Sequence, residues 1–118
     1  MSKQRASFGM RNTMKIEVLY FEGCPSWQTG VENLNATLKL EGLSWPVELV
    51  EVQDDVDAQR RRFLGSPSFQ FSGDDLWPQN RQEYAMSCRM YPTPEGLRGW
   101  PTVEMFKEGL RALVGRKA

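Results

Sequence analysis

Residues 15–27 read KIEVLYFEGCPSW, and this stretch decides the fold that we predict for the chain. Lys15–Phe21 is a nearly continuous run of apolar, β-forming residues, which is typical of a strand buried on both faces. Gly23 ends the run, and Pro25 suits the first turn of a helix because an N–H there has no helical partner. The stretch therefore predicts a buried strand that passes directly into a helix, with Cys24 at the helix N-cap.

The remaining elements follow from apolar periodicity and from Gly, Pro and Asp punctuation. In chain order we expect a helix (25–40), a strand (46–53), a short helix (56–64), a strand (66–72), a return strand (76–77) and a closing helix (101–114). A connection at 78–99 has no predicted secondary structure. The order β-α-β-α-β-β-α predicts an α/β protein with a mixed four-stranded sheet flanked by helices. This domain covers residues 14–115, after a flexible tail at 1–13.

Composition excludes several classes of function. The 118 residues carry 15 basic and 15 acidic side chains, so a net charge of zero gives no electrostatic reason to expect nucleic acid or an anionic membrane as partner. No apolar run approaches the length of about 20 residues that crosses a bilayer. The chain has no histidine, which excludes Ser-His and Cys-His catalysis and His-ligated zinc. We expect a cytoplasmic protein in which the two cysteines are reduced or reactive and do not form a permanent structural disulfide.

Cys24 is the leading candidate for chemistry. A thiol at a helix N-cap faces unpaired N–H groups and the positive end of the helix dipole, which favour the thiolate. We therefore expect a pKa below the value of about 8.5 that a free cysteine has. Glu22 would oppose this shift if its carboxylate lies close. The alternative is that Cys24 is a small buried apolar residue.

Two weaker features have structural explanations beside the functional ones. The run Arg60–Arg62 fits a solvated helix face paired with aspartates, and the alternative is an anion site. Asp54, Asp55 and Asp57 fit helix capping better than a hard-metal site, because no matching loop ligands follow. We therefore predict no metal bound by these residues.

A strand followed by Cys24-Pro25-x-x and a helix, with Gly65-Ser66-Pro67 later opening a strand, resembles the thioredoxin/glutaredoxin superfamily. The segments FEGCP, RFLGSPSF and SCRMYPTPEGL are similar in detail to a group of small bacterial thioredoxin-like proteins. The resemblance covers residues 14–114. It implies that Cys24 is the attacking thiol and that Pro67 is a cis-proline beside it, although X–Pro bonds in general favour trans. It also implies that Pro25, Ser26, Pro67 and the backbone of Ser66 help to bind and position a peptide or glutathione.

The chain departs from that family at one position. Trp27 stands where the resolving cysteine is expected, so the motif is monothiol-like, Cys-Pro-Ser-Trp. Strand 66–72 starts at the sheet edge where the first strand ends, so the connection at 78–99 leaves from the same edge. Cys88 can therefore reach Cys24 as a substitute resolving thiol, and Arg89 could lower its pKa. The alternative is an unpaired Cys88.

These observations predict a thiol redox protein, in enzyme terms a thiol–disulfide oxidoreductase. Its partners would be protein or small-molecule thiols and disulfides, with no bound cofactor beyond glutathione as a thiol co-substrate. Two alternatives stay open. One is a binding module that kept the fold without catalysis, and the other is capture of a soft metal such as mercury by the two thiolates.

Overall fold

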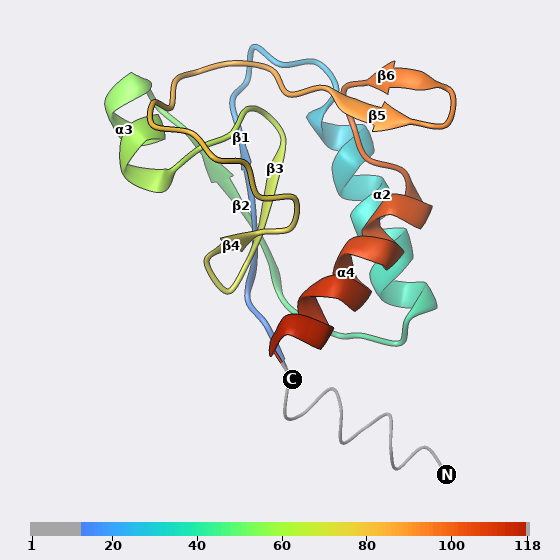
Figure 1. Cartoon of the computed structure of the whole chain (residues 1–118). Coiled ribbons are helices and arrows are strands. Elements are labelled where there is room, and N and C mark those ends of the chain that lie inside the picture. Colours follow the sequence, from blue (N-terminus) through green and yellow to red (C-terminus); the bar gives the residue numbers. More distant parts are fainter. Residues whose placement is uncertain (1–12, 118) are drawn as a thin grey trace, which may run out of the picture.

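The computed structural model describes residues 13–117, which form a four-stranded sheet, a two-stranded hairpin and three helices (Figure 1). In chain order the elements are β1 (Ile16–Tyr20), α2 (Trp27–Leu40), β2 (Val47–Glu51), α3 (Asp55–Arg61), β3 (Ser68–Phe71), β4 (Asp74–Asp75), β5 (Tyr91–Thr93), β6 (Gly96–Arg98) and α4 (Val103–Lys117). The predicted tail, residues 1–13, lies outside the described residues except for Thr13.

The main sheet is mixed and has the strand order β2-β1-β3-β4. β1 is central: it pairs parallel to β2, with Ile16 opposite Val47, and antiparallel to β3, with Ile16 opposite Phe71. β4 pairs antiparallel to β3 at the edge. The prediction of a mixed four-stranded sheet flanked by helices is confirmed.

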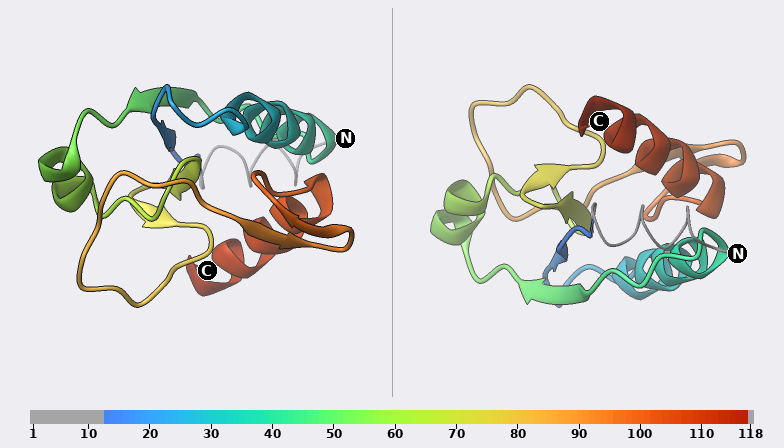
Figure 2. Two further views of the ribbon diagram at one scale, coloured as in Figure 1. Left: turned by 90° about the horizontal axis from the view of Figure 1, so that it is seen from above. Right: turned by 90° about the horizontal axis from the view of Figure 1, so that it is seen from below.

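Helices α2 and α4 lie together over one face of this sheet, and α3 lies on the other side (Figure 2). The face under α2 and α4 is wholly apolar at its centre, because alternate residues of β1 and β3 point toward it. The buried side chains there include Ile16, Val18, Leu34, Leu38, Phe69, Phe71, Phe106, Leu110 and Leu113. The opposite face has a smaller cluster made of Leu19, Val52, Ala58 and Phe63.

The predicted return strand at 76–77 is wrong, because the hairpin turns earlier. Ser72 and Gly73 form its two-residue loop with φ angles of 54° and 90°, the left-handed values that a tight hairpin turn requires. Asp74 and Asp75 are then the paired residues, and Leu76 is buried in the apolar core. Because the turn lies at Ser72 and Gly73, Asp75 is a strand residue that pairs with Gln70 of β3.

The connection at 78–99 is also more ordered than predicted, because it ends in the β5–β6 hairpin. The segment before this hairpin, residues 78–90, is here called the strap. It leaves β4, passes α3 and crosses near the end of β1 before it reaches β5 (Figure 1). Two of its backbone N–H groups donate to α3 side chains: Tyr84 N–H to Gln59 Oε1 at 3.2 Å and Met86 N–H to Asp55 Oδ1 at 2.9 Å.

Among residues 13–117, no helix combines the length and the hydropathy that crossing a bilayer requires.

Candidate dithiol site

Cys24 lies in the turn that follows β1. Its backbone N–H donates to Phe21 O at 3.1 Å, which turns the chain back toward the sheet. The Cys24 residue is only 3% exposed, and its thiol donates to the carbonyl oxygen of Ser66 at an S···O distance of 3.3 Å. The sulfur is therefore buried but not isolated among hydrocarbon, because it has a polar partner.

The prediction that Cys24 is the helix N-cap is wrong. The cap is Ser26, two residues later, and α2 begins at Trp27. The reason is local: the Cys24 N–H closes the turn with Phe21, and the first carbonyl that accepts from the helix is that of Ser26, from Gly30 N–H at 3.5 Å. The Cys24 thiol therefore donates to the carbonyl oxygen of Ser66, which lies two residues before β3. It is not held by the N–H groups at the start of α2.

Ser66 is fully buried and joins three parts of the chain at this point. Its hydroxyl accepts from Phe21 N–H at 3.3 Å, next to the Cys24 turn. Its N–H donates to Ser87 O at 2.8 Å, and its carbonyl accepts from Arg89 N–H at 2.9 Å as well as from Cys24. These backbone bonds form a parallel β-bridge between Ser66 and Cys88. The backbone that the resemblance assigned to a bound partner is thus occupied by the protein's own strap.

The bridge brings Cys88 to Cys24. Both cysteines are free thiols, with Cys24 buried and Cys88 exposed. The pKa of Cys88 is raised above the ordinary value of a cysteine, first by a hydrogen bond with the Cys24 thiol, then by desolvation, then by the Cys24 charge. The Cys24 thiol and the Cys88 backbone thus both lie against Ser66, which brings the two cysteines to one point of the fold.

Arg89 does not act on Cys88 as predicted. Its side chain turns away from the thiols into the interior, where it is 4% exposed and pairs with Asp75. The pKa of Cys88 is raised and not lowered, and Arg89 is not among the causes. The expectation that a neighbouring guanidinium would acidify this thiol is therefore wrong.

The remaining predicted site residues are Pro25, Ser26 and Pro67. Ser66–Pro67 is a cis peptide, as the resemblance implied. The carbonyl of Pro67 accepts from the buried hydroxyl of Tyr91. Pro25 is exposed, and Ser26 makes no side-chain cap bond and lies close to Gly99.

The acidic and basic runs are structural. Asp54 caps α3 by accepting from Asp57 N–H at 2.8 Å, as predicted. Asp57 in turn pairs with Arg60 and Arg61. Within residues 13–117, no three or more histidine, cysteine, aspartate or glutamate side chains gather as metal ligands.

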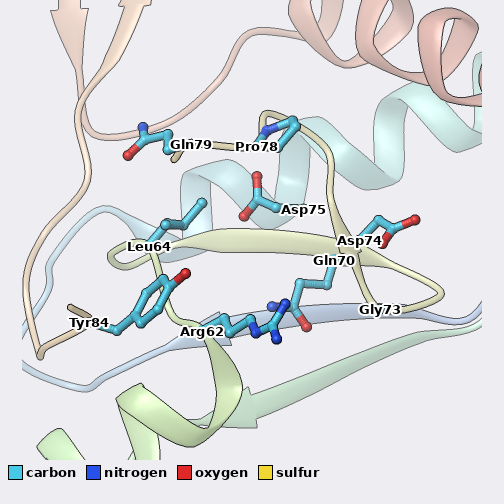
Figure 3. Close-up of a pocket in the computed structure, with 9 residues that line it drawn as sticks. All are labelled: Arg62, Leu64, Gln70, Gly73, Asp74, Asp75, Pro78, Gln79 and Tyr84. Atoms are coloured by element: carbon cyan, nitrogen blue, oxygen red, sulfur yellow. The ribbon is translucent and has the colours of Figure 1, made fainter. Parts of the chain in front are cut away.

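Arg62 is the C-cap of α3 and borders a cavity of about 420 Å³ between β4 and the strap. Figure 3 shows Asp75, Gln79 and Tyr84 around this cavity, together with Arg62. Its lining mixes both signs of charge and includes neither thiol. The cavity is thus separate from the dithiol site, although Asp75 contributes to the surroundings of both.

Sequence reasoning missed Asp75 and Tyr91, which surround Arg89 beside the thiols. The guanidinium of Arg89 lies 4.9 Å from the centre of the Tyr91 ring. Asp75 lies in a Gly-Asp-Asp stretch that is typical of a turn, and no local pattern connects it with Arg89, 14 positions later. The only available signal was the juxtaposition of Cys88, Arg89 and Tyr91 in one short segment.

The described residues thus define a mixed α/β protein in which a buried and an exposed thiol meet beside a cis-proline. Comparison with protein-family models, with curated proteins and with solved structures gives no significant match to this chain.

Proposed function

We propose that this protein is a thioredoxin-like thiol–disulfide redox protein whose working groups are Cys24 and Cys88. The observation that carries the proposal is that two free thiols converge on Ser66: the Cys24 thiol donates to its carbonyl oxygen at 3.3 Å, and Cys88 forms a β-bridge with it. It is supported by the sheet order β2-β1-β3-β4 and by the position of Ser66–Pro67 beside Cys24. A cytoplasmic location fits this function, because a reducing compartment keeps such a pair available for exchange.

The exposure of the two sulfurs favours a defined order of events. The thiolate of exposed Cys88 attacks one sulfur of a partner disulfide, and the partner's other sulfur leaves as a thiolate. The thiolate of Cys24 then attacks the Cys88 sulfur, which releases the second partner thiolate and leaves a Cys24–Cys88 disulfide. Two electrons pass to the partner, and the two protons of the protein thiols are taken up by the released thiolates. This order reverses the roles that the resemblance implied.

Glutathione disulfide is the partner that we propose to test first. The strap already pairs with the backbone of Ser66, so an incoming partner contacts the exposed Cys88 and not an unpaired strand edge at that residue. A small disulfide can reach such a sulfur without adding a strand to the sheet.

Trapping the mixed disulfide tests this proposal. Wild-type protein incubated with glutathione disulfide should form a Cys24–Cys88 disulfide, identified by mass spectrometry of the unreduced digest. Cys24→Ser should accumulate glutathione on Cys88, because the resolving thiol is absent, whereas Cys88→Ser should react slowly. Met90→Ala, which changes an exposed strap residue near Cys88, serves as the matched control and should behave as wild type.

Two results would overturn the proposal. One is an oxidised wild-type protein without a Cys24–Cys88 link, which would favour a non-catalytic binding module. The other is stoichiometric capture of a soft metal by both thiols with no disulfide exchange. Glutathione trapped on Cys24 in Cys88→Ser, with no adduct in Cys24→Ser, would reverse the order of attack only.

A further inference from the structure

Beside the dithiol site lies a buried ion pair that links the strap to the sheet. Arg89 Nη1 lies 3.0 Å from Asp75 Oδ2, and the two side chains are 4% and 8% exposed. Arg89 Nη2 donates to Trp77 O at 2.7 Å, so the guanidinium is held at more than one of its nitrogens. Asp75 also accepts from Trp77 N–H at 2.8 Å, and its carboxylate is visible in Figure 3.

The same residue that makes this ion pair also sets the position of Cys88. The backbone N–H of Arg89 donates at 2.9 Å to Ser66 O, the carbonyl oxygen that also accepts from the Cys24 thiol. Cys88 therefore lies one residue from a guanidinium that is fixed by Asp75. Because the Cys88 side chain itself is exposed, its own packing does not determine where it lies.

We infer that Asp75 and Arg89 are positioning residues for the thiol pair, which hold Cys88 against Cys24 and thereby set how readily the disulfide forms. This inference rests on the proposed redox function. The physical reason is that an intramolecular reaction depends on how much of the time the two groups lie in reacting geometry. A strap released from Asp75 has more freedom, which lowers the effective concentration of Cys88 toward Cys24.

Stability alone does not explain this ion pair. Removing two charges from water costs about as much as their mutual attraction returns, so buried ion pairs are often no better than apolar side chains of the same size. In agreement, burial raises the pKa of Asp75, and Arg89 compensates only in part. What an apolar replacement cannot reproduce is the directed contact with Trp77 O and Asp75 together.

The test is the equilibrium between the protein's thiol pair and glutathione. Wild type, Arg89→Met and Asp75→Asn are equilibrated in buffers of varied glutathione redox ratio, and the oxidised fraction is read by mass spectrometry. We expect the equilibrium constant for the Cys24–Cys88 disulfide to fall about tenfold in each variant. The double variant Asp75→Leu/Arg89→Met leaves no unpaired buried charge, and it should show the same fall while folding normally.

Two further variants separate positioning from general destabilisation. Asp57→Asn removes a buried carboxylate whose ion pairs are with Arg60 and Arg61 of α3 instead of with Arg89. It should change the equilibrium constant by less than twofold. Arg89→Lys keeps the charge and loses the planar fork, so its equilibrium constant should fall between those of wild type and Arg89→Met.

The outcomes separate the two claims. An unchanged disulfide equilibrium constant in the folded double variant would overturn the positioning role and leave the proposed redox function intact. An equal fall in Asp57→Asn would also overturn it. A wild-type protein that forms no Cys24–Cys88 disulfide at any glutathione ratio would overturn both.

Discussion

Two regions of this molecule rest on the same four strands but are held by different interactions. The core under α2 and α4 consists of buried apolar side chains centred on Phe69 and Phe106. Its stability does not depend on the direction of any single bond. The strap is held by hydrogen bonds to Ser66 and α3 and by the ion pair with Asp75, and Met86 adds an apolar contact with the smaller cluster. Burial of apolar area is not directional, whereas a hydrogen bond is lost with a shift of about 1 Å.

This difference indicates which region can move. A core residue shares its contacts among many neighbours, so the core opens only when the whole domain unfolds. The bonds of the strap can break one at a time, which is the property that the proposed redox function requires of a segment carrying a reactive thiol. The three predictions that follow separate the two regions by changing one at a time.

Phe69→Ala should give the largest loss, because it opens the centre of the core. Phe69 is fully buried, and its ring packs edge-on against Phe106 with centroids 4.9 Å apart. Removing a buried aromatic ring costs about 3–5 kcal/mol of unfolding free energy. Urea unfolding followed by tryptophan fluorescence measures the change.

Leu40→Ala is the matched control, because Leu40 ends α2 and is 68% exposed. Its effect should stay within about 0.5 kcal/mol. A loss of less than about 1 kcal/mol in Phe69→Ala would mean that the core does not determine the stability of the domain.

Gly65→Ala should give a smaller loss that falls on the strap. Gly65 has φ +114°, and an added Cβ would lie 2.8 Å from the Cβ of Arg89 and 3.2 Å from its backbone nitrogen. A strained backbone position costs about 1–3 kcal/mol, and here the strap must also retreat from Ser66. We therefore expect alkylation of Cys24 in the folded protein to become faster, as measured by mass spectrometry of labelled peptides.

Gly73→Ala separates the two parts of that effect. Gly73 also has a positive φ, +90°, but an added Cβ would meet no atom within 4 Å. This variant should therefore lose stability without exposing Cys24. Equal labelling of Cys24 in both variants would show that general destabilisation, and not the strap contact, exposes the thiol.

The core was the more predictable region, for a physical reason. Apolar residues of β1 and α2 recur at the spacings of a strand and a helix, so the local sequence already states which side is buried. The mixed sheet and its flanking helices follow from that pattern. The errors there lie at element ends, where one hydrogen bond decides, as with the cap at Ser26 instead of Cys24.

The strap could not be predicted in the same way. Its contacts join residues far apart in the chain, such as Ser66 with Cys88 and Asp75 with Arg89, and no periodicity marks such pairs. Topology predicted only that Cys88 leaves from the sheet edge near Cys24. Two features depend on packing that a linear pattern does not contain. The strap pairs with the backbone of Ser66, and the guanidinium of Arg89 turns inward.

The last and smallest effect concerns protonation. The hydrogen bond with Cys24 is the largest cause of the raised pKa of Cys88, so Cys24→Ala should lower that pKa toward its usual value. The rate of Cys88 alkylation against pH, followed with iodoacetamide, should have a midpoint above the ordinary pKa of a cysteine in wild type and a lower midpoint in Cys24→Ala. Because the pKa of Cys88 is higher in the folded than in the unfolded chain, its contribution to stability is present below the unfolded-state pKa and is lost as the pH rises through the folded-state pKa. An identical midpoint in the two proteins would mean that the two thiols do not interact. That result would contradict the proposal that they act as a pair.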